Sequence, residues 1–188
     1  MKTVLAVVVA LSVVQAGCWW KREPKTDAGI CEKNVTRLGA TTSELERFYS
    51  LAHVAKCAFD DGDFELARQL ATESLELAQR FPEDWNYGNA VHDGNVVLGR
   101  LALLDGNSEL AIEHLQKAGQ TPGSPQLNSF GPNMTLARDL LQNGYWDPVY
   151  DYLEHCRVFW KLERGKIDRW QELVSAKKIP DFGANLYY

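Results

Sequence analysis

Three cationic residues occupy equivalent positions along the chain, and their side chains could together bind an anionic group. Each lies six residues before a glycine that follows an acid or an amide. The cations are Lys56, Arg100 and Arg138, and the glycines are Gly62, Gly106 and Gly144. An arginine can hold a carboxylate through two parallel hydrogen bonds, so a column of cations would suit an acidic segment of a protein or peptide partner.

Asn95 and Asn133 also occupy equivalent positions, five residues before Arg100 and Arg138. Such positions lie near each other on a helix without sharing one stripe. The two amides therefore extend the candidate partner-binding set. The alternative is that each cation is solvated, or pairs with an acid of a neighbouring helix pair and contributes little.

A second group combines polar and aromatic side chains between residues 85 and 95. Its members are Trp85, Asn86, Tyr87, Asn89, His92 and Asp93. Asn89 and Asp93 are four residues apart and would share a helix face, so the segment could bind a sugar, another small molecule or a metal. The competing interpretation is close helix packing, because Gly88, Gly94 and Gly99 lie nearby and each glycine costs a helix about 1 kcal/mol.

The sequence carries no recognisable catalytic motif. It shows no serine–histidine–acid order, glycine-rich phosphate loop or paired-carboxylate motif. No CxxC or cysteine–histidine spacing indicates zinc, so no metal or cofactor is expected. Cys57 and Cys156 lie in apolar helical patterns and are either buried hydrophobes or partners in a disulfide. We therefore expect a protein that is not an enzyme.

The first 17 residues are predicted to be a removable signal peptide. Lys2 precedes the short apolar run from Val4 to Val14, which is shorter than the roughly 20 residues a membrane-spanning helix needs. The Ala-Gly-Cys sequence ending at Cys18 resembles a bacterial lipoprotein signal, which implies lipidation of Cys18. Gln15 departs from that pattern, so ordinary cleavage after Ala16 is the alternative. Both routes predict export, to the cell envelope or beyond it.

The net charge and the length of the chain limit the remaining classes of function and the number of domains. The net charge is −5, and it becomes −6 once residues 1–17 and their single lysine are removed. An acidic protein of this kind is not expected to bind nucleic acid, whose phosphates dominate affinity. Residues 18–41 are charged and without period, and they predict a tether. Residues 42–188 are long enough for one ordinary folded domain. The oligomeric state stays open.

The matched cations belong to a wider repeat. Each copy has an aliphatic residue, a small residue, a cation and pairs of apolar residues, in that order, before the glycine. The glycines lie 44 and 38 residues apart. A repeat at this period indicates stacked helical hairpins. One such hairpin cannot bury its apolar face alone, and a stack of them builds a groove rather than an enclosed catalytic pocket.

Apolar spacing and turn residues predict the helices. They cover residues 43–60 and 64–80, 84–104 and a partner that runs to about 118, and 132–142 and 148–162. Residues 167–177 form a terminal cap with a polar outer face, and residues 181–188 are expected to dock back. The fold class is therefore all-α: an α-solenoid of about three antiparallel helical hairpins with a C-terminal capping helix.

Local signals refine this prediction. Ser43 and Glu46 fit a capping box at the start of the first helix. Each turn glycine is expected to take a left-handed conformation, which needs no Cβ. In the loop 124–133, either Asn128 or Ser129 caps the next helix, or the loop closes over the end of the groove.

At these residues the chain resembles the tetratricopeptide repeat family over about residues 43–160. That family's unit of about 34 residues has a small residue in its first helix, a glycine–acid turn, an early alanine in its second helix and a closing proline. The matching residues are Ala55, Gly62, Asp63, Phe64, Ala67 and Pro82, then Leu98, Gly99, Gly106, Ala111, Ala118 and Pro122, then Leu136, Ala137 and Gly144. The spacing is longer than the family's, Val149 replaces the alanine, and the third copy lacks its proline.

The resemblance implies a superhelical stack whose first helices line a concave groove, and binding of a protein or peptide rather than chemistry. Residues 88–95 and 124–133 also resemble parts of exported bacterial helical-repeat proteins without an assigned activity. We therefore expect an exported, lipid-anchored scaffold that binds a protein or peptide in this groove. The alternative is an envelope protein that binds a small molecule or glycan through the segment from Trp85 to Asn95.

Overall fold

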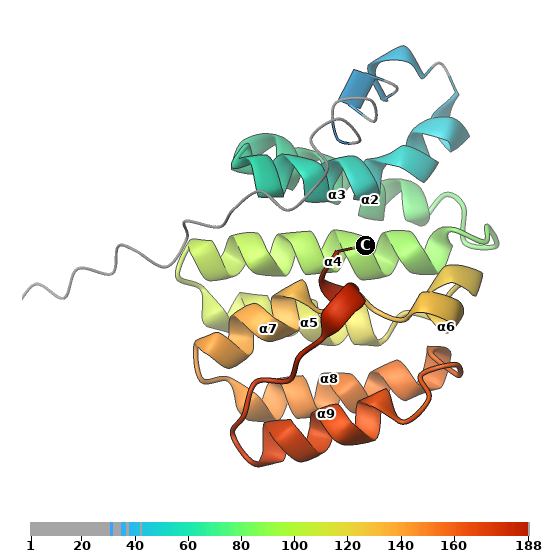
Figure 1. The fold of residues 1–188 in the computed structure, drawn as a ribbon. Helices are drawn as coiled ribbons and strands as arrows, with labels where there is room; N and C mark the ends of the chain where they lie inside the picture. The colour runs from blue at the N-terminus through green and yellow to red at the C-terminus, as the bar shows by residue number, and fades with distance from the viewer. Residues whose placement is uncertain (1–30, 32–34, 37, 42, 188) are drawn as a thin grey trace, which may run out of the picture.

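The computed structural model describes residues 31, 35–36, 38–41 and 43–187 (Figure 1). This part of the chain is helical and contains no strand, so the predicted all-α class is confirmed. The predicted signal peptide, the candidate lipidation site Cys18 and the tether up to residue 30 lie outside the described residues.

The helices pair in chain order and stack, as Figure 1 shows. With the labels of that figure they are α2 (Glu44–Asp61), α3 (Phe64–Ala78), α4 (Tyr87–Leu104), α5 (Ser108–Gly119), α6 (Pro125–Phe130), α7 (Thr135–Gln142), α8 (Trp146–Phe159), α9 (Lys166–Ser175) and the 3-10 helix η1 (Gly183–Leu186). The pairs are α2–α3, α4–α5 and α7–α8, and α9 packs on α8. The first helices of the pairs, α2, α4 and α7, are called the A helices, and α4 packs against both of the others.

The three turn glycines adopt one conformation. The φ angles of Gly62, Gly106 and Gly144 are 85°, 78° and 84°. In each turn the amide of the residue after the glycine donates to a carbonyl in the last turn of the helix, at 2.9, 2.9 and 3.0 Å. This is the hydrogen bond that closes a helix with a left-handed residue. The repeated stretches of sequence therefore encode a repeated turn.

The helix starts also follow the repeat, except in its third copy. Asp63 and Asn107 follow their glycines, and their side chains accept from the amides of Leu66 and Leu110. Tyr145 occupies the same place before α8 and makes no such cap. At the start of α2, Ser43 accepts from the Glu46 amide, as its capping pattern predicts.

Helix α4 lies between two apolar cores. Val97 and Leu101 belong to the first core, which is formed with α2 and α3. Val96 and Ala102 belong to the second core, which is formed with α5, α7, α8 and α9. The glycines of α4 permit this two-sided packing. A Cβ on Gly99 would lie 2.4 Å from a methyl carbon of Leu136, so the packing interpretation of these glycines holds.

The loop between α5 and α7 differs from its prediction. Residues 125–130 form the extra helix α6, because Ser124 caps it and Pro125 occupies its first turn. Asn128 accepts from the Lys161 amide at 3.0 Å and does not cap α7. The Asn133 side chain instead accepts from the Thr135 amide at the start of α7. The proposed capping by Asn128 or Ser129 is therefore wrong.

The cysteine pairing also differs from its prediction. Cys57 forms a disulfide with Cys31, and Cys156 is a free, buried thiol whose pKa is raised by desolvation. A Cys57–Cys156 disulfide is therefore wrong, since Cys156 packs in the core of the later helices. Cys31 and Leu38 are helical and buried, so the described part of the predicted tether packs on the domain.

Two glycine substitutions should separate turn strain from close contact. Gly106→Ala should lower the free energy of unfolding by about 1 kcal/mol, because only its left-handed backbone opposes a Cβ. Gly88→Ala should lower it by about 3 kcal/mol or more, because the Cβ would lie 1.8 Å from the Gly123 carbonyl oxygen. Urea unfolding checks both; equal, small losses would contradict the close approach at Gly88.

Candidate functional site

The A helices present a shared polar surface, which we call the A face. It is made of Tyr49, His53, Lys56 and Asp60 on α2, Trp85, Asn89 and Asp93 on or just before α4, and Arg138 on α7, together with Arg100 of α4 and Asp139 of α7, which are buried and pair with its residues. The four α2 residues recur at helical spacing and so share one stripe. The predicted column of cations lies on this face, and each of its members meets an acid.

Lys56 joins α2 to α4. Its Nζ donates to a carboxylate oxygen of Asp93 at 2.7 Å, and both side chains keep a minor exposed fraction. This corresponds to the alternative weighed from the sequence, in which the cations pair with acids of neighbouring hairpins.

Arg100 lies at the centre of a wider set of ion pairs. Its Nε donates to Asp139 at 2.9 Å, and its Nη1 lies 3.4 Å from a carboxylate oxygen of Asp60. The guanidinium also covers the ring of Phe59 at 3.9 Å. Arg100 is only 3% exposed, so this residue is an internal strut among α2, α4 and α7 and not an exposed contact for a partner.

Two guanidinium nitrogens near Asp139 keep spare donors. Arg138 donates through Nη2 to Asp139 at 3.2 Å. Its Nε and the Nη2 of Arg100 are buried and have no hydrogen-bond partner within the described part of the chain. A buried donor left unpaired costs about 1–3 kcal/mol. These two unpaired donors are therefore a cost in free energy at the centre of the ion-pair set.

Asn95 and Asn133, predicted as partner contacts, have structural roles. Asn95 donates to the Val91 carbonyl at 2.7 Å and accepts from Nδ1 of His114 at 2.8 Å. Asn133 accepts from both the amide and the hydroxyl of Thr135. Both asparagines are buried, so neither belongs to an exposed binding surface, and this correction removes them from the candidate set.

The predicted segment from Trp85 to Asn95 divides into an exposed and an internal part. Trp85 is 48% exposed and lies beside Tyr49, which is 37% exposed, with ring centroids 5.2 Å apart. The Tyr49 hydroxyl donates to Asp84 at 2.8 Å, and this hydrogen bond raises the pKa of Tyr49. Tyr49 was missed by the sequence analysis, although an aromatic residue outside the apolar stripe of α2 is a readable signal.

The amides of this segment bind other parts of the protein. Asn89 donates to Asn86 at 3.0 Å and to Gln126 at 3.3 Å, and it accepts from the Ser124 hydroxyl at 2.5 Å. Tyr87 packs, partly buried, against the first core. Asn86, Tyr87 and Asn89 thus hold α4 against α6 and the first core, as the packing interpretation predicts.

His92 is buried with both ring nitrogens in use. Nδ1 donates to the Ala118 carbonyl at 3.1 Å, and Nε2 accepts from the Asn133 amide at 3.0 Å. Because a carbonyl only accepts and an amide only donates, these partners define one neutral tautomer. Burial lowers the pKa of His92, while nearby Asp93 opposes the shift. The ring has no free nitrogen for a metal, and the described residues contain no cluster suited to one.

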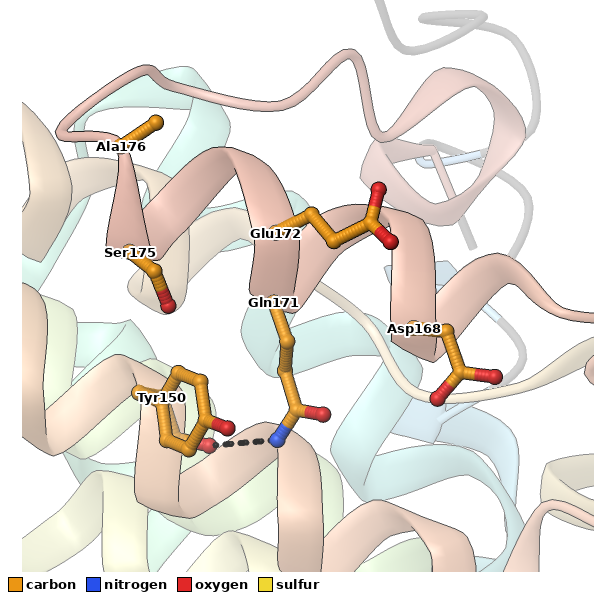
Figure 2. A pocket seen from close by; sticks show the side chains of 6 residues that line it. All are labelled: Tyr150, Asp168, Gln171, Glu172, Ser175 and Ala176. Atoms are coloured by element: carbon orange, nitrogen blue, oxygen red, sulfur yellow. Dashed lines mark hydrogen bonds between the residues drawn. The ribbon is translucent and has the colours of Figure 1, made fainter.

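A surface hollow of about 640 Å³ lies at the other end of the stack, between α8 and α9 (Figure 2). It is lined by Tyr150, Asp168, Gln171, Glu172, Ser175 and Ala176. The Gln171 side chain donates to the Tyr150 carbonyl at 3.4 Å. None of these residues stood out in the sequence, and none brings a catalytic group beside a base.

The fold and the A face define a class: an all-α array of helical hairpins with a polar, partly aromatic surface on its first helices. Comparison with known protein families, curated proteins and solved structures found no match. Among the described residues, every helix is too short or too polar to cross a membrane.

Removing the buried ion pairs of Arg100 should lower the stability of the protein strongly. Arg100→Met should lower the free energy of unfolding by about 3 kcal/mol or more, because buried Asp139 loses a charged partner. The control Arg68→Met breaks an exposed pair with Asp105 and should cost less than about 1 kcal/mol. Urea unfolding gives both values; similar losses would refute the central role of Arg100.

The neutral state of His92 should make stability depend on pH. The folded pKa is below the unfolded one, so the unfolded chain takes up the proton first as the pH falls. The contribution of His92 to stability should be full above about pH 6.5 and fall below it, by up to about 1.4 kcal/mol per pH unit. His53 and His114, whose pKa values are also lowered by partial burial, contribute in the same direction. His92→Gln should flatten this dependence in urea unfolding, whereas His53→Gln should leave most of it. An unchanged slope in His92→Gln would contradict the assignment.

Proposed function

We propose that this protein is an exported, tetratricopeptide-like scaffold, anchored through lipidated Cys18, that binds a protein or peptide partner on its A face. The stack of hairpins supports the proposal, because such arrays offer extended surfaces rather than enclosed pockets. The proposed role is binding without catalysis, and the net negative charge favours a partner other than nucleic acid.

The exposed pair Tyr49 and Trp85 carries this proposal. Tyrosine and tryptophan are the residues most often found at the energetic centre of protein interfaces. Here the rings lie 5.2 Å apart, and Asp84 fixes the Tyr49 hydroxyl. A fixed ring loses little freedom on binding, so this pair is a prepared anchor for an apolar side chain of the partner.

The partner is proposed to carry an acidic segment next to that anchor. Lys56 and Arg138 are the partly exposed cations of the A face. The exposed parts of these two side chains are where such a carboxylate would bind, whereas the Nε of Arg138 and the Nη2 of Arg100 are buried. The buried position of Arg100 shifts the proposed contact toward Lys56 and Arg138.

The disulfide supports the proposed location outside the cytoplasm. A bond between Cys31 and Cys57 persists in oxidising compartments and is rare where glutathione keeps thiols reduced. The segment before it carries the lipoprotein-like sequence that ends at Cys18.

A glycan or other small ligand is the second candidate. The observation that favours it is the open indole of Trp85 beside the carboxylate of Asp84, which could accept hydrogen bonds from hydroxyl groups of a ring stacked on the tryptophan. This candidate uses a small part of the predicted segment, because Asn86, Asn89 and His92 already bind other groups of the protein.

Variants of the anchor should weaken partner binding. With a partner captured from envelope extract and then purified, Trp85→Ala should raise the dissociation constant about 30-fold, as expected for an interface centre worth about 2 kcal/mol. Lys56→Gln and Arg138→Gln should raise it less and should weaken its salt dependence. Isothermal titration calorimetry measures all three.

Leu110→Ala is the matched control, because Leu110 is an exposed hydrophobic residue on α5 and outside the A face. Equal affinity of Trp85→Ala and wild type would refute the A-face proposal. A rise in melting temperature with an oligosaccharide, lost in Trp85→Ala, would instead establish the second candidate.

A further inference from the structure

The segment 179–187 returns from α9 to the stack and is anchored by two buried side chains. Phe182 is enclosed in the second core, with its ring edge-to-face on Trp170 at a centroid distance of 5.0 Å. Asn185 is 0% exposed. We call this segment the tail, and Figure 1 shows its 3-10 helix η1 crossing the stack beside α7.

Asn185 binds the connection between α6 and α7. The side-chain Nδ2 of Asn185 donates to the carbonyls of Phe130 at 3.1 Å and Pro132 at 2.9 Å. The backbone carbonyl of Asn185 accepts from the Met134 amide at 2.7 Å. Lys166 of α9 donates to Oδ1 at 3.4 Å. These groups and Trp170 form a receptor for a Phe-x-x-Asn sequence, which we call the tail slot.

The slot recognises the tail through side chains and backbone of both partners, as a peptide-binding site does. An asparagine that donates to two carbonyls and also accepts from a cation has its hydrogen-bonding capacity well used. Three residues earlier, the aromatic ring supplies the apolar anchor. None of these contacts requires that the tail and the slot belong to the same copy of the chain.

The hinge between α9 and the tail carries strain. Lys177 has a φ of 54°, a left-handed conformation that a residue with a Cβ adopts at a cost in free energy. Two backbone hydrogen bonds, from the amides of Lys177 and Lys178, hold the turn. Lys177, Lys178 and Ile179 are exposed. The Lys177 side chain also contacts α8, with its Nζ 3.6 Å from Asp147 and 5.6 Å from the centre of the Trp146 ring. The backbone strain of the turn that returns the tail to its own chain is therefore only partly offset by these contacts.

We propose that the tail slot is a peptide-binding site that also takes Phe182 and Asn185 from a second copy of this chain, with Lys177 as the hinge. Exchange keeps every contact in the slot and lets Lys177 leave the left-handed region. Exchange is opposed by the loss of two turn hydrogen bonds, of the contacts of Lys177 with Asp147 and Trp146, and of the freedom of separate monomers. The exchanged dimer thus forms at high protein concentration, through two identical slots related by symmetry.

Substitutions at Lys177 test the hinge. Lys177→Pro fixes φ near −65°, which excludes the observed turn, so this variant should be dimeric by light scattering at concentrations where wild type is monomeric. Lys177→Gly should dimerise about tenfold more weakly than Lys177→Ala, because both lose the lysine side chain and only glycine accepts the turn. A monomeric Lys177→Pro, or equal dimerisation of the glycine and alanine variants, would overturn the proposal.

The slot itself is tested with a peptide. A synthetic peptide of residues 178–187 should raise the melting temperature of full-chain Asn185→Ala, whose own tail binds poorly, and should leave wild type unchanged. The same peptide with its asparagine replaced by alanine is the control. The double variant Lys177→Pro, Asn185→Ala should be monomeric, and its chain should still be folded. A dimer that survives this change, or a peptide without effect on Asn185→Ala, would show that the slot does not recognise the tail of another copy.

Discussion

One buried guanidinium keeps the three A helices in register. Arg100 extends from α4 to Asp60 on α2 and to Asp139 on α7, over the ring of Phe59. A buried charge is tolerated only when it is paired and hydrogen-bonded. The helices therefore cannot slide past one another without breaking these pairs. The relative places of Tyr49 and Arg138 on the A face follow from this restriction.

The helix pairs could be predicted because each depends on chemistry that is local in sequence. A glycine at the left-handed turn position marks each hairpin, and Gly62, Gly106 and Gly144 all adopt that conformation. Helix α6 was missed although Ser124 and Pro125 are a readable start signal, since the surrounding prolines and glycines favour a loop. The partner of Cys57 depends on how the preceding segment folds back, and no periodicity in residues 18–41 indicates that.

The position of the candidate site was predictable, but the availability of its residues was not. The ion pairs of Lys56 and Arg100 join residues 37 to 40 apart, close to the repeat itself, so an acid one repeat away is the signal that reveals them. Asn95 and His92 instead bind the backbone of Val91 and Ala118. Every residue has a backbone carbonyl, so residue types do not indicate which carbonyl a side chain will bind. These partners could be identified only from the folded structure.

The disulfide has a mechanical consequence. Cys31 is bonded to Cys57 in the second half of α2, and 26 positions separate the two residues. A force pulling on the chain ahead of Cys31 enters the stack at Cys57, and the covalent loop between the cysteines bears no load. The first turns of α2, with their cap at Ser43 and the ring of Tyr49, are thereby shielded from being peeled away. Tension would reach the stack close to the Lys56–Asp93 pair, where α2 is tied to α4.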